Sequence, residues 1–153
     1  MKYYTFGHIG YIERNKITKA RNLIDTHKLY ISKAYGERGE YPFFFLGKPF
    51  YGEPNSCCSQ SYLVIGPFTN KEQCDIVAKY IKTRFFRCLI MLKKNAQDNM
   101  RQVFQCVPIQ KFELNAEIDW SKSISEIDRQ LYEKYGLNKQ EIDFIESMIR
   151  PME

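Results

Sequence analysis

Residues 76–97 contain no acidic side chain, yet they carry a dense group of cations. The group comprises Lys79, Lys82, Arg84, Arg87, Lys93 and Lys94. Aromatic side chains at Tyr80, Phe85 and Phe86 stand among them. Lysine and arginine neutralise phosphates, arginine can also read guanine through two hydrogen bonds, and rings can pack against sugars or bases. The segment therefore indicates a contact with nucleic acid; a helix whose basic face is merely solvated is the alternative.

Two polar stretches could supply contacts to base edges. Residues 97–102 combine amides with a guanidinium, the groups that suit adenine and guanine edges, and residues 54–61 are rich in small donors and acceptors. The candidate base-reading residues are Asn55, Ser56, Gln60, Gln97, Asn99 and Arg101. Plain polar turns would have the same composition, so the sequence leaves both interpretations open.

Residues for independent catalysis are harder to find. His8 and His27 are the only imidazoles, and neither has the spacing that would pair it with a nucleophile or with a second metal-binding histidine. The glycines form no phosphate-binding loop. Carboxylates that could hold a metal ion occur at Glu40, Glu53, Asp98 and Glu113, but none is followed by a Glu-x-Lys pattern. We predict no catalytic or metal-binding residue in this chain.

Charge is distributed unevenly along the chain. Residues 1–112 carry 18 basic and 8 acidic side chains, a net charge of +10, whereas residues 113–153 carry 5 and 10, a net charge of −5. This asymmetry predicts a polyanionic partner for the first part. Five cysteines without disulfide or zinc spacing favour a reducing cytoplasm, and we expect neither a signal peptide nor a membrane span.

Periodicity predicts the elements that must position these residues. Strands are expected at residues 3–6, 28–34, 61–65 and 103–107, and a short amphipathic helix at residues 17–24. A helix should begin near Asn70, where Thr69 opens a capping-box sequence, and continue to Lys94 either unbroken or broken once. Residues 35–55 form a loop interrupted by glycine and proline, either pinned to the core by its rings or presented to a ligand.

The last part of the chain predicts a helical hairpin. Ser123 or Ser125 would cap a helix that reaches Tyr135, Gly136 would end it, and Asn138 would cap a second helix over residues 139–150. We expect a single domain, with residues 1–112 as its body and residues 113–153 as a hairpin packed against that body.

Several motifs occur in an order that resembles a known family. They are KPFYGEPNS at 48–56, SQSYLVIGPF at 59–68, YIKTRFFR at 80–87, VP at 107–108, LYEKYGL at 131–137 and IDFIESMIRP at 142–151. Together they resemble the C-terminal target-recognition region of fused type II methyltransferase-restriction enzymes, including TaqI-like specificity domains. The resemblance implies an α+β fold with a curved, mainly antiparallel sheet, flanking helices and loops that read the DNA major groove.

The resemblance also implies a function and partners. We expect a sequence-specific module that recognises double-stranded DNA for a restriction-modification system and works with a methyltransferase or endonuclease catalytic domain or subunit. The chain itself should hold no cofactor, while magnesium and S-adenosylmethionine would belong to the full system. The alternatives are a metal-dependent restriction endonuclease that uses carboxylates such as Glu40 and Glu53, and a protein-interaction subunit that docks through its acidic helices.

Overall fold

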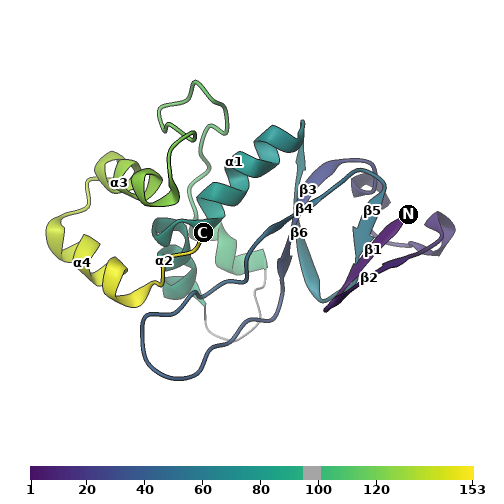
Figure 1. The fold of residues 1–153 in the computed structure, drawn as a ribbon, viewed down its shortest axis with the longest axis horizontal. Helices are drawn as coiled ribbons and strands as arrows, with labels where there is room; N and C mark the ends of the chain where they lie inside the picture. Colours follow the sequence, from purple (N-terminus) through teal and green to yellow (C-terminus); the bar gives the residue numbers. More distant parts are fainter. Residues whose placement is uncertain (95–100) are drawn as a thin grey trace.

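The computed structural model describes residues 1–94 and 101–153, and it has the expected α+β architecture (Figure 1). In these residues the strands form two three-stranded sheets, with the orders β2-β1-β5 and β4-β3-β6. The bounds are Lys2–Thr5 (β1), His8–Tyr11 (β2), His27–Ser32 (β3), Phe50–Gly52 (β4), Ser56–Cys58 (β5) and Tyr62–Phe68 (β6). All pairings are antiparallel except the parallel pair β1–β5. The strands thus divide between two small sheets instead of sharing one curved sheet.

Aromatic side chains join the two sheets. The Tyr4 ring of β1 lies 5.3 Å from the Tyr30 ring of β3 and 5.4 Å from the Phe50 ring of β4. Tyr30 is fully buried, and its hydroxyl shares a 3.0 Å hydrogen bond with Ser56 Oγ of β5. Such tilted ring pairs add stabilisation beyond the area they bury. The N-terminal sheet is therefore anchored to the central one.

The basic segment forms two helices, α1 (Lys71–Lys82) and α2 (Arg84–Lys93), as the once-broken helix predicted. Asn70 caps α1 by accepting a hydrogen bond from the Gln73 amide. The break falls at Thr83, whose backbone is extended and whose side chain caps α2. The buried faces of both helices contribute to the main hydrophobic core.

The predicted helical hairpin is confirmed as α3 (Ile124–Lys134) and α4 (Lys139–Met148). Ser123 and Asn138 each form a complete capping box, and Gly136 takes the left-handed conformation, with φ 65°, in the turn between the helices. The C-terminal end of the chain also pins the loop over residues 35–49, because the backbones of Phe43 and Ile149 form a parallel bridge. Phe45 of this loop also packs against the main hydrophobic core, which agrees with pinning by its rings, whereas presentation of the loop to a ligand stays a prediction.

Two predicted elements are wrong, and the predicted loop at residues 35–55 is shorter than expected, because β4 (Phe50–Gly52) forms within it. Residues 17–24 do not form an amphipathic helix; two short 3-10 helices, η1 (Arg14–Lys16) and η2 (Arg21–Leu23), flank Ala20 in the left-handed conformation. Residues 103–107 lie largely in a 3-10 helix, η3 (Arg101–Cys106), and not in a strand. The reason lies in tertiary packing. Val103 is buried in the main core, and the centre of the Phe104 ring lies 6.2 Å from that of Phe86 in α2, so both neighbouring side chains pack inward.

Candidate nucleic-acid interface

Arg87, a predicted phosphate contact, is fully buried and serves the fold instead. Its guanidinium donates hydrogen bonds to the backbone carbonyls of Lys82 and Thr83 at the helix break, and to those of Phe44 and Arg150 from distant segments. Burial lowers the pKa of this guanidinium to about 10. Its placement corrects the sequence prediction, because a guanidinium that is fully buried among carbonyl acceptors cannot reach a DNA phosphate.

Most of the other cations of residues 76–97 also bind carbonyls. Lys79 Nζ donates to the carbonyls of Trp120 and Lys122 at 2.9 and 3.2 Å, which ties α1 to the segment before α3. Arg84 Nε donates to the Ile149 carbonyl at 3.0 Å, and Lys94 Nζ to that of Tyr35 at 3.0 Å. A sequence does not show which backbone carbonyls will accept hydrogen bonds from these cations. The absence of acidic residues in this segment therefore favoured phosphate as their partner.

The remaining predicted contacts are placed as follows. Lys82 is half-buried, and burial lowers the pKa of its amine. Ser56 is fully buried and donates a hydrogen bond to the Glu53 carbonyl, so its placement also argues against base reading. The candidates that stay exposed are Asn55, Gln60, Lys93 and Arg101. Gln97 and Asn99 lie outside the described residues.

A second group of cations, in residues 14–21, is better placed to meet a polyanion. We call this segment the cationic turn; it contains Arg14, Lys16, Lys19 and Arg21 and no acidic residue. All four residues are exposed. Arg14 forms an ion pair with Asp25, whereas no ion pair found among the described residues involves the other three cations. The sequence contains these cations close together, but the helix predicted for residues 17–24 treated them as its solvated face and not as a binding group.

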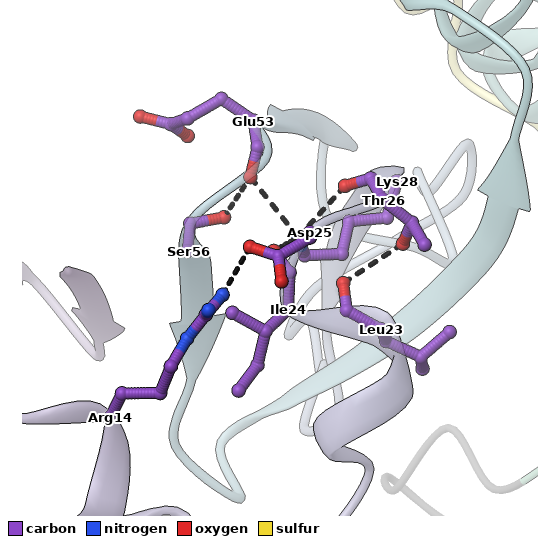
Figure 2. A network of polar contacts seen from close by, with 8 residues as sticks. All are labelled: Arg14, Leu23, Ile24, Asp25, Thr26, Lys28, Glu53 and Ser56. Atoms are coloured by element: carbon purple, nitrogen blue, oxygen red, sulfur yellow. Dashed lines mark hydrogen bonds and ion pairs between the residues drawn. The ribbon is translucent and has the colours of Figure 1, made fainter.

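A buried lysine holds the turn at residues 23–26, which follows the cationic turn (Figure 2). Lys28 is 1% exposed, and its ammonium donates hydrogen bonds to the carbonyls of Ile24, Thr26 and Glu53 at 3.0–3.1 Å. Burial lowers the pKa of this amine. The three carbonyls come from two turns, residues 23–26 and 53–56, so Lys28 joins them.

Exposed Asn55 lies against the turn at residues 23–26, which follows the cationic turn. The Asn55 amide donates to the Ile24 carbonyl at 2.8 Å, and the Asn55 carbonyl accepts from the Lys2 amide at 3.3 Å. Asn55 has φ 63°, a left-handed conformation that asparagine tolerates better than most residues. One predicted base-reading residue and the cations therefore belong to the same end of the molecule.

The carboxylates weighed for metal binding are not brought together in the described residues. Glu53 forms an ion pair with Lys2 Nζ at 2.5 Å and accepts a 2.7 Å hydrogen bond from the Tyr4 hydroxyl. Glu40 and Glu113 are exposed, and Asp98 lies outside the described residues. No group of three His, Cys, Asp or Glu residues with metal-binding geometry occurs in residues 1–94 and 101–153. The endonuclease alternative stays a prediction, to be tested by incubating the protein with plasmid and magnesium.

Comparison with protein-family models, with curated proteins and with solved structures finds no match to this chain. The resemblance to restriction specificity regions thus stays a prediction from the motifs. Among the described residues, no helix combines the length and the apolar character needed to cross a membrane.

Proposed function

We propose that this chain recognises double-stranded DNA as the specificity module of a restriction-modification system, and that the cationic turn is its phosphate-binding element. The observation that carries the proposal is the exposure of Lys16, Lys19 and Arg21 without carboxylate partners in the described structure. Arg21 also donates to the Ile17 carbonyl, at 3.4 Å. Exposed cations of this kind neutralise phosphates and release the counterions condensed on the DNA, which supplies essentially all of the non-specific affinity for DNA.

The other proposed contacts come from the residues that remain exposed. Asn55, which contacts Ile24 a few residues after the cationic turn, has an amide that suits an adenine edge, and Gln60 and Arg101 offer an amide and a guanidinium. We propose that a methyltransferase or endonuclease catalytic partner docks on the acidic helices α3 and α4 and brings magnesium and S-adenosylmethionine chemistry with it. The assembly would act in a reducing cytoplasm, which the five free cysteines favour.

A salt titration tests the proposal. We expect fluorescence anisotropy with a labelled 20-base-pair duplex to show affinity that falls steeply as salt rises. Substituting Lys16, Lys19 and Arg21 by alanine should flatten the slope of log affinity against log salt by about 2 to 3, since each phosphate contact contributes roughly 0.9.

The matched control removes three exposed cations from the other half of the chain, Lys111, Lys122 and Lys139. This variant loses the same net charge, so a specific role for the cationic turn requires that its slope stay close to that of the wild type. Equal flattening in both variants, or wild-type protein with no salt-dependent binding, would contradict the proposal.

A further inference from the structure

The β1–β2 hairpin exposes three large apolar side chains at the N-terminal end of the molecule. Phe6 is 76% exposed, Ile9 64% and Tyr11 80%. Single exposed hydrophobic residues are ordinary on a protein surface, but three within six residues of one hairpin form a local group.

The register of the hairpin defines where these side chains stand. Tyr4 pairs with Ile9 and Lys2 with Tyr11, so Ile9 and Tyr11 lie on the same face as Tyr4. In the described sheet β2 is an edge strand, which places Ile9 and Tyr11 at the rim. Phe6 occupies the two-residue turn with Gly7, whose φ of 77° is one that glycine adopts without steric cost. The apolar side chains thus follow the tip and the outer edge of the ribbon.

The hairpin is held at its base and leads directly into the cationic turn. The Tyr4 ring packs against Tyr30 and Phe50, and backbone hydrogen bonds join Met1 and Ile12 in both directions. Only two residues separate Tyr11 from Arg14. An anchored ribbon beside a group of cations is suited to a duplex, because the phosphates on either side of a groove can be held while the ribbon enters it.

We propose that the β1–β2 hairpin enters the major groove of DNA, where Phe6, Ile9 and Tyr11 contact bases while the cationic turn holds the neighbouring phosphates. This inference rests on the proposed function. A two-stranded ribbon fits the major groove, which is about 12 Å wide, and the thymine methyl group accepts apolar contacts there. The cations favour a polyanion over an uncharged protein surface as the occupant.

The test compares two double variants on a preferred and a random duplex. The preferred duplex is selected from a randomised pool with wild-type protein. Replacing Phe6 and Tyr11 by alanine should weaken binding to the preferred duplex by about 10- to 100-fold while leaving the salt slope on random duplex unchanged. Both side chains are exposed, so the fold should be retained, as circular dichroism can verify.

The matched control replaces Leu92 and Phe144, which are 67% and 48% exposed in the helical half, by alanine and should bind both duplexes like the wild type. As a second readout, duplex carrying 5-iodouracil should photo-crosslink to the hairpin, with the adducts mapped by mass spectrometry. Crosslinks confined to other segments, or an unchanged preference in the hairpin variant, would overturn the hairpin inference and leave the proposed function standing.

Two further outcomes separate the alternatives. If the wild-type protein shows no salt-dependent binding to random duplex, the proposed function fails and the hairpin inference fails with it. If the protein binds vesicles of phosphatidylcholine and phosphatidylserine, and only that binding is lost in the Phe6 and Tyr11 variant, then the occupant is a lipid surface and the hairpin inference is overturned.

Discussion

At the scale of single residues, Arg87 shows why a cation-rich segment does not by itself mark a DNA surface. Its planar guanidinium donates hydrogen bonds to backbone carbonyls of the helix break, of the loop before β4 and of the C-terminal end. A lysine has fewer donors and no rigid fork, so Arg87→Lys should lower the free energy of unfolding by about 2–4 kcal/mol. Urea denaturation measures this. Lys93→Ala, on the exposed side of α2, should change it by less than about 0.5 kcal/mol, and equal stability of all three proteins would contradict the structural role.

Asp128 gives a pH-dependent prediction. Its carboxylate accepts 2.9 Å hydrogen bonds from the Arg84 and Phe85 amides at the start of α2, and burial raises its pKa to about 6. Because this value exceeds the ordinary 3.8, the folded state binds the proton more tightly than the unfolded state does. The Asp128 contribution should therefore be largest below pH 4 and fall by up to about 3 kcal/mol as pH rises through 6.

The comparison with Asp128→Asn isolates this effect. The asparagine variant keeps the shape but cannot ionise, so the difference in unfolding free energy between wild type and variant should change between pH 4 and pH 7. Chemical denaturation at several pH values measures the difference. A constant difference over the whole range would mean that Asp128 does not titrate as the geometry implies.

At the scale of elements, most helix ends could be predicted from local sequence, whereas the strand pairings could not. Ser123, one of the two candidates, and Asn138 cap their helices as predicted, because a cap depends on the few residues that follow it. The first helix begins near Asn70 as expected, but its cap is Asn70 and not Thr69. The parallel pairing of β1 with β5 joins segments about 50 residues apart and has no local signature. Residues 103–107 alternate well enough for a strand, but contact with α2 favours a 3-10 helix. Tertiary contacts decided both.

Lys28 tests how one side chain holds two turns. Lys28→Met removes the donor for three carbonyls, so it should lower the free energy of unfolding by about 2–4 kcal/mol. Amide hydrogen exchange should increase most in residues 23–26, which follow the cationic turn, and in residues 53–56, which include Asn55. Exposed Lys48→Met is the control and should leave exchange unchanged. A uniform increase over the whole Lys28→Met chain would argue against a local clip.

At the scale of the whole molecule, the charge asymmetry predicted from the sequence takes a spatial form. The N-terminal sheet and the cationic turn occupy one end of the longest axis, while the acidic tail, residues 113–153, forms α3 and α4 at the other (Figure 1). The net charge of each of the two parts, residues 1–112 and 113–153, could be counted from the sequence. The sequence could not show which cations stay exposed, because exposure depends on carbonyls contributed by distant segments. For this reason the candidate site lies in the cationic turn and not in α1 and α2, where the sequence predicted it.

Because the two ends are separated, the effect of the acidic tail on DNA affinity should depend on salt concentration. Replacing the exposed Glu113, Glu133 and Glu153 of the tail by glutamine removes three negative charges at a distance from the proposed DNA surface. Charges act over a Debye length of about 8 Å at 0.15 M salt and about 30 Å at 0.01 M. The variant should therefore bind random duplex less than about twofold more tightly than wild type at 0.15 M, but several-fold more tightly at 0.01 M. Anisotropy titrations at both salt concentrations check this, and an increase of the same size at both would place DNA against the tail instead of the cationic turn.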